Sequence, residues 1–221
     1  FYTLGGDKLP SGRGHGEPVR LMVDLPNDQE IVTLFVHRPG EKVLVASSDG
    51  RGFVVPEDDV IAQTKNGKQA LNVGKEVEAQ ACAPVTGDTV AVVGDNRKII
   101  LFPLDELPEM SRGRGVKLQS YKDGGLSDAT TFTRDMLLLV CDLLPSAQHI
   151  KVAQINGHRE AFGPFVAQEL LWRMATSTRT TLEHLELASN SLGEDGAVAV
   201  AAALGVVECL VTVDLSGNDI G

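Results

Sequence analysis

Short apolar runs alternate with polar turns through the first 132 residues. The stretch from Glu41 to Tyr121 contains the same arrangement twice: apolar strand, polar turn, second apolar strand, proline, acidic turn, and a loop rich in glycine and basic residues. Equivalent positions are 47 residues apart (103 − 56 for the prolines), and the pairs are Val43 and Val90, Val45 and Val92, Phe53 and Ile100, Pro56 and Pro103, Val60 and Leu107, and Leu71 and Leu118. Self-similarity at this period indicates a propeller or another repeat array.

The apolar runs are short and rich in Val, Ile and Leu, which predicts strands rather than helices. Because turn signals follow one another every 8–12 residues or so, the pattern favours all-β blades. The expected strands of the two copies are 42–47, 51–55, 89–93 and 97–102, with closing strands at 69–73 and 77–84. Three further strands are expected upstream, at 1–4, 19–25 and 30–37.

The pattern changes after Phe132. Helical spacing appears over 134–144 and 161–176. The run from Leu182 to Gly193 then recurs from Leu210 to Gly221 at an offset of 28 (218 − 190), and both runs fit the L-x-x-L-x-L-x-x-N-x-L pattern of a leucine-rich repeat. A helix is expected at 196–204 and a first repeat strand at 150–155. The predicted fold class is therefore mixed: an all-β blade region (1–132), a helical junction (133–149) and an α/β repeat segment (150–221).

The chain has 221 residues and a net charge of −10, which argues against nucleic-acid binding driven by bulk charge. Its basic residues are unevenly placed, since residues 1–133 carry 15 of the 20. The three cysteines are far apart in apolar runs, which favours reduced thiols in the cytoplasm. The apolar runs fall short of the roughly 20 residues that span a bilayer, so no membrane partner is expected.

Three glycine-rich loops carry much of the positive charge: 11–16, 65–68 and 111–115. Glycine lets the backbone approach an anion closely, and an arginine fork can hold two phosphate oxygens at once. These loops are candidate phosphate-binding sites, and the candidate DNA-binding residues are Arg112, Arg114, Lys117, Lys65, Lys68 and Arg13. The alternative is that the loops are solvated turns whose charges keep the blade edges soluble.

Catalytic and metal-binding patterns are not recognisable in the sequence, and no catalytic residue, metal ligand or cofactor is predicted. The five histidines lack zinc-ligand spacing. The glycines at 12, 14 and 16 precede Pro18 and an expected strand, whereas a dinucleotide-binding motif opens a helix. The acidic runs 57–59 and 105–106 occupy equivalent places in the two copies and are expected to be structural turns. Asn190 and Asn218 are expected to turn inward and bond backbone groups.

Three stretches of the chain, Ala46 to Phe53, Gly67 to Val73 and Ser111 to Asp128, carry a family resemblance. They resemble the C-terminal domain of the topoisomerase IV A subunit, which is related to the gyrase A subunit. The resemblance covers residues 1–132. It implies a β-pinwheel, in which neighbouring blades exchange strands and duplex DNA bends over a basic rim. The SRGRG loop at 111–115 matches the basic blade loops of that family. The full gyrase box is absent, which favours the topoisomerase IV branch.

The resemblance also implies a complete enzyme, an ATP- and magnesium-dependent type IIA DNA topoisomerase (an isomerase) with nucleoid association and a B subunit. The cleavage tyrosine belongs to a part of the family that is missing here, so these residues are expected to hold DNA without catalysis. The alternative function is a protein-interaction scaffold. In that case a protein ligand would bind the strand face of the repeat segment, which carries Glu183, His184, Glu186, Val211, Thr212 and Asp214.

Overall fold

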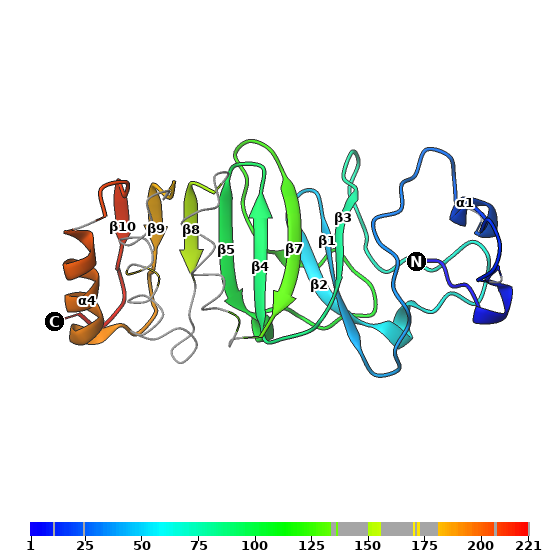
Figure 1. Ribbon diagram of the computed structural model, residues 1–221, viewed down its shortest axis with the longest axis horizontal. Coiled ribbons are helices and arrows are strands. Elements are labelled where there is room, and N and C mark those ends of the chain that lie inside the picture. The colour runs from blue at the N-terminus through cyan, green and yellow to red at the C-terminus, as the bar shows by residue number, and fades with distance from the viewer. Residues whose placement is uncertain are drawn as a thin grey trace.

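The computed structural model describes residues 1–10, 12–23, 25–133, 136, 150–155, 170, 172, 181–205 and 207–220. These residues form two sheets that follow one another along an elongated molecule (Figure 1). The N-terminal segment lies at one end, and α4 (Gly193–Leu204) lies at the other. Apart from residues 136, 170 and 172, the predicted helices at 134–144 and 161–176 lie outside the described residues.

The first blade is a four-stranded antiparallel sheet in the order β3-β1-β2-β6. Its strands are β1 (Lys42–Ser47), β2 (Arg51–Pro56), β3 (Ala79–Pro84) and the short β6 (Val116–Lys117). Nearly every residue of β1 and β2 is buried, because one face packs on Val60 and Ala70 and the other on the second blade. A 3-10 turn, η2 (Glu57–Val60), follows β2.

The second blade repeats the first strand by strand. It contains β4 (Thr89–Gly94), β5 (Lys98–Pro103), η3 (Leu104–Glu106) and β7 (Leu126–Phe132). Even the irregularities coincide, because the ladder of β1 with β3 shifts at Ala46/Ser47 and that of β4 with β7 shifts at Val93/Gly94, again 47 residues on (93 − 46). The 47-residue repeat predicted from the sequence is confirmed as two equivalent blades.

The two blades exchange a strand, as the resemblance implied. β6 lies between β5 and β7 of the second blade in the chain but pairs with β2 of the first, with Arg51 opposite Lys117 and Gly52 opposite Val116. The approach is close: a Cβ on Gly115, whose φ is +71°, would lie 2.1 Å from the Gly52 carbonyl oxygen. Glycine is therefore required where the exchanged strand enters the neighbouring sheet.

The repeat segment (150–221) extends the second blade instead of folding apart from it. Its strands β8 (Val152–Ile155), β9 (His184–Glu186) and β10 (Thr212–Asp214) are parallel, and β8 pairs with the outer edge of β5. β8 thus has the place beside β5 that β6 has beside β2. Blade and repeat residues share one apolar core, and the Lys98 ammonium lies 2.9 Å from the Glu186 carboxylate.

Two buried asparagines tie the repeat strands together. The Asn190 amide donates to the carbonyls of Ile155 and Leu187, both at 2.8 Å. The Asn218 amide donates to the Leu187 carbonyl at 2.7 Å, and its side-chain oxygen accepts the Asn190 backbone N–H at 2.6 Å. Both predicted inward asparagines are confirmed, as is the intervening helix, which begins three residues before the predicted residue 196.

The strand predictions for the N-terminal segment are wrong. Residues 19–25 contain a short helix, α1 (Val19–Met22), directly after Pro18, and another turn, η1 (Gly6–Lys8), precedes it. Residues 30–37 are irregular: Leu34 is 70% exposed and Val36 is 82% exposed, so none of the described strands covers them. The stretches 1–4 and 69–73 form no strand either: Phe1 exchanges two backbone bonds with Lys68, and Leu71 forms an isolated bridge with Gly113.

Candidate nucleic-acid interface

The basic loop at 111–115 lies against residues 70–72 of the first copy. The Gly113 N–H donates to the Ala70 carbonyl at 2.9 Å, and the Asn72 N–H donates to the Gly113 carbonyl at 2.7 Å. These bonds bring the 65–68 loop, which directly precedes residue 69, to the neighbourhood of the 111–115 loop. Two of the three predicted loops are therefore adjacent in the fold.

The Arg112 side chain is exposed and ordered by two neutral amide groups. Its Nε donates to the Asn72 Oδ1 at 3.2 Å, and its Nη2 donates to the Gln69 Oε1 at 3.3 Å. Two of its five N–H donors are used, which leaves three for an external acceptor. Because both partners are uncharged, the full positive charge of Arg112 is available to an anion.

The Arg114 side chain faces a carboxylate. Its Nη2 lies 3.3 Å from Asp49 Oδ2, in the turn between β1 and β2. The Ser47 hydroxyl donates to the other oxygen of Asp49 at 2.5 Å. The Arg114 side chain remains 56% exposed although it is ion-paired.

The remaining lysines of the set are exposed. Lys117 lies in β6 opposite Arg51, whose guanidinium donates to the Gly115 carbonyl at 3.3 Å. Lys65 and Lys68 are exposed on their loop. Arg112, Arg114 and Lys117 therefore lie on the exchanged strand and the loop before it, and Lys65 and Lys68 lie on the loop that precedes Gln69, a partner of Arg112.

Arg13 is not tied to this surface by any described contact. Its loop is exposed, and a Cβ added to Gly12 or Gly16 would meet nothing within 4 Å. The structure thus brings two of the predicted loops together and leaves the third in open surroundings.

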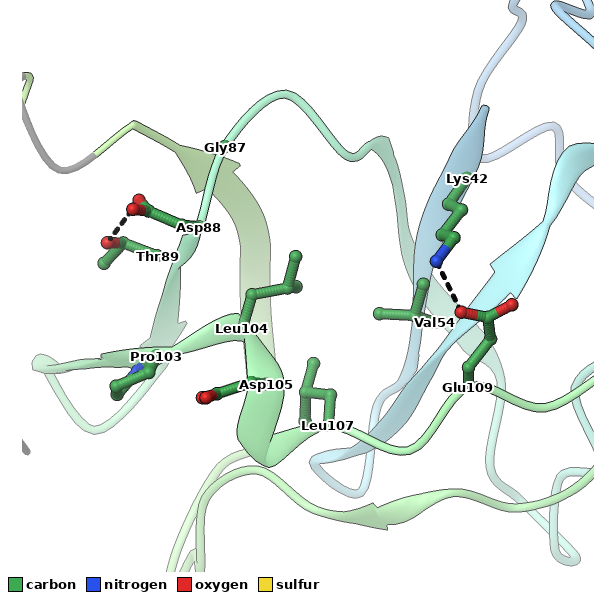
Figure 2. A pocket seen from close by; sticks show the side chains of 10 residues that line it. All are labelled: Lys42, Val54, Gly87, Asp88, Thr89, Pro103, Leu104, Asp105, Leu107 and Glu109. Carbon is green, nitrogen blue, oxygen red and sulfur yellow. Dashed lines mark hydrogen bonds and ion pairs between the residues drawn. The ribbon is translucent and has the colours of Figure 1, made fainter. Parts of the chain in front are cut away.

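A pocket of about 490 Å³ lies between the two blades, away from these loops (Figure 2). Lys42 points into it and lies 2.5 Å from the Glu109 carboxylate, and Asp88 and Asp105 add two further carboxylates to its lining. An anion would meet net negative charge here. The pocket is therefore no candidate for a phosphate.

The first acidic turn, at 57–59, is structural, as expected. The buried Glu57 accepts the Arg38 N–H at 2.6 Å, and Asp58 accepts the Gly40 N–H at 3.0 Å and contacts the His37 ring at 2.8 Å. The pKa of Asp58 is lowered mainly by the hydrogen bond from the Gly40 N–H, and to a smaller extent by the bond with the His37 ring. Within the described part of the chain, His, Cys, Asp and Glu form no group that could hold a metal ion.

Burial disfavours the thiolate form of both described cysteines. Burial raises the pKa of Cys82 to about 12, and burial also raises the pKa of Cys209. A thiol with a raised pKa is a poor nucleophile at neutral pH. Both cysteines are free, while Cys141 lies outside the described residues. Among the helices described, none is long and apolar enough to cross a bilayer.

Sequence reasoning did not find the residues that hold the two arginines. Gln69, Asn72 and Asp49 are 40 to 65 positions away in the chain. One signal was present: Gln69 and Asn72 lie in the stretch 67–73 that carries part of the family resemblance.

Comparison with known proteins agrees with this geometry. Residues 41–86 and 88–126 match the family described as DNA gyrase C-terminal domain, beta-propeller. By its fold and by this match, the blade region belongs to the gyrase C-terminal domain family. Residues 179–201 and 208–221 match the leucine-rich repeat family.

Within its class, the blade region is of the type found in the A subunit of topoisomerase IV. It is similar to the A subunits of DNA topoisomerase 4 from Caulobacter vibrioides (53% identical over 135 residues) and from Rickettsia bellii (45% over 135 residues). Each match covers 61% of this chain and 18% of the relative, so the chain spans under a fifth of their length. The ParC C-terminal domain from E. coli has the same fold, with a TM-score of 0.56 and 23% identity over 60% of this chain and 58% of that one.

Proposed function

We propose that the blade region holds duplex DNA by its phosphates and so directs which DNA segments a type IIA topoisomerase acts on. The observation that carries the proposal is the basic surface at the exchanged strand, where Arg112 keeps its charge between two neutral amides. Phosphate contacts supply affinity and register without reading sequence. The family match supports the proposal, because the relatives are named as topoisomerase subunits.

The rest of the machinery belongs to a longer protein in this proposal. Cleavage, ATP and Mg²⁺ would be supplied by the catalytic part and by the B subunit. The whole assembly would be associated with the nucleoid. The repeat segment would be a leucine-rich-repeat unit that extends the second blade. Its parallel strands and its two inward asparagines support that assignment.

Charge reversal tests the proposal. The double variant Arg112→Glu/Arg114→Glu should bind a fluorescent duplex roughly tenfold or more weakly, with little dependence on DNA sequence, because phosphate contacts are lost. Fluorescence anisotropy at several salt concentrations measures the effect. Lys8→Glu/Arg20→Glu is the matched control, since it makes the same charge change on the N-terminal segment. Equal losses in the two double variants would remove the 111–115 loop from the binding surface.

A protein-interaction scaffold is the second candidate function. It is favoured by the strand face of the repeat segment, where Glu186 and Asp214 lie side by side on β9 and β10 beside His184 and Thr212. Because Lys98 pairs with Glu186 and Lys151 with Glu183, these carboxylates are largely neutralised, and Asp214 adds one further negative charge to the face. Absence of duplex binding by the wild-type chain at low salt would favour the scaffold.

A further inference from the structure

The two arginines of the 111–115 loop differ in the charge of their partners. Arg112 is held by the neutral amides of Gln69 and Asn72, at 3.3 and 3.2 Å, whereas Arg114 lies 3.3 Å from the Asp49 carboxylate. An approaching phosphate would therefore meet a full positive charge at Arg112. At Arg114 it would meet an ion pair whose net charge is close to zero.

The two arginine side chains also differ in the kind of group that holds each of them in place. An arginine that is already held in place loses less conformational freedom when it binds, and neutral acceptors give that order without cancelling its charge. The Asp49 carboxylate orders Arg114 too, but it repels the phosphate that Arg114 would attract. Since Ser47 fixes Asp49 by a hydrogen bond of 2.5 Å, the carboxylate cannot turn away without losing a partner.

The internal repeat gives a second, independent reason to distinguish Arg112 from Arg114. At the 47-residue offset, Arg112 corresponds to Lys65 (112 − 47), so a basic residue occupies this position in both copies. Arg114 corresponds to Gly67 (114 − 47), which has no charge. Asp49 corresponds to Asn96 (49 + 47), so its carboxylate is specific to the blade that faces Arg114.

We propose that Arg112, positioned by Gln69 and Asn72, is the phosphate contact of this loop, and that Asp49 is a built-in counter-ion that weakens DNA binding by Arg114. The inference rests on the proposed function and assigns unequal roles within it. Gln69 and Asn72 are positioning residues. Asp49 limits the affinity of the surface for duplex DNA.

The test measures the affinity of the full chain for a labelled duplex as a function of NaCl concentration. Asp49→Asn should bind about fivefold more tightly, which is the effect of one unit charge at contact distance in water, with a steeper salt dependence. Arg112→Gln should bind more weakly and flatten the log–log salt slope by about 0.9. Arg114→Gln should weaken binding less than Arg112→Gln does and leave the slope unchanged, because the ion-paired guanidinium neutralises no phosphate.

The double variant Asp49→Asn/Arg114→Gln completes a cycle, and its affinity should return to within about twofold of the wild type. Glu208→Gln is the matched control, because it removes one exposed carboxylate from the repeat segment and leaves the loop unchanged. A gain in Asp49→Asn no larger than that in Glu208→Gln would overturn the counter-ion role. A flattening of the slope in Arg114→Gln as large as that in Arg112→Gln would overturn the division of roles, while the proposed function would stand.

The positioning role has its own readout. Gln69→Ala/Asn72→Ala keeps every charge, so it should weaken binding about threefold or more while the salt slope stays that of the wild type. Gln69→Glu should instead flatten the slope, since it gives Arg112 a counter-ion. Unchanged affinity in the Ala double variant would overturn the positioning role. A wild-type chain that binds no duplex at low salt would overturn this inference and the proposed function together.

Discussion

Gly115 determines how closely the exchanged strand approaches its neighbouring blade. Its φ of +71° is strained for any other residue, and an added Cβ would lie 2.1 Å from the Gly52 carbonyl oxygen. Gly115→Ala should therefore lower the free energy of unfolding by about 1–3 kcal/mol, as measured by urea denaturation. Gly12→Ala is the control: its Cβ would meet nothing within 4 Å, so its effect should stay within about 0.5 kcal/mol. Equal effects would contradict the close approach.

Tyr121 lies between the turns of the two blades. A Cβ on Gly50 or on Gly94 would lie 2.4 Å from its ring carbons, and its hydroxyl is buried without a hydrogen-bond partner among the described residues. A buried hydroxyl without a partner costs free energy. Tyr121→Phe should therefore leave stability at neutral pH unchanged or raise it by up to about 1 kcal/mol. A clear loss of stability would show that the hydroxyl has a partner.

The same tyrosine should make stability depend on alkaline pH. Burial, and to a smaller extent the negative charge of Asp95, raises the pKa of Tyr121 from 10.0 to about 12. The unfolded chain therefore ionises first, and the wild type should lose stability relative to Tyr121→Phe as the pH rises from 10 to 12. Denaturant unfolding of both proteins across this range checks the sign. Parallel pH profiles would contradict it.

At the scale of elements, β8 couples the repeat segment to the second blade. Ala153 of β8 is fully buried in the core that Ile99 and Leu101 of β5 share with the repeat strands. Ala153→Asp would place a charge in that core and should cost about 3 kcal/mol or more. Hydrogen exchange should show that β5 loses protection together with β9.

Val152→Asp is the control for that variant. Val152 neighbours Ala153 on the same strand, but its side chain points to the other face and is only partly buried. The amides of β5 should keep their protection in this variant. If Ala153→Asp also left β5 protected, the blade and the repeat segment would be independent units.

The elements that the sequence predicted well are those whose pattern repeats. Two copies of one alternation, 47 residues apart, gave the strands β1, β2, β4 and β5 close to their observed bounds. Residues 30–37 have an equally β-like composition, yet they form no strand, because strand formation needs a neighbouring edge that local pattern does not reveal.

Pairing between distant segments was predictable only in part. The family resemblance implied that blades exchange strands, but neither the pairing of β6 with β2 nor that of β8 with β5 follows from local sequence. The same limit applies to the candidate site. Glycine and arginine marked the 111–115 loop, whereas its partners Gln69, Asn72 and Asp49 come from another copy of the repeat.

At the scale of the whole molecule, both parts of the chain are net negative, but most of the basic side chains lie in the blade region. Residues 1–133 carry 15 basic and 19 acidic side chains, and residues 134–221 carry 5 and 11. The repeat segment occupies the outer edge of the second blade, so the sheet continues into an acidic region (Figure 1). In the proposed function, DNA held on the blades would be repelled beyond that edge.

The salt dependence of duplex binding by the full chain tests the central claim most directly. Each phosphate neutralised contributes about −0.9 to the slope of log K against log salt. With Arg112, Lys117, Lys65 and Lys68 as contacts, a slope of about −2 to −4 is predicted. A chain that binds no duplex at low salt, or whose binding does not change with salt, would contradict the claim that the blades hold DNA by its phosphates.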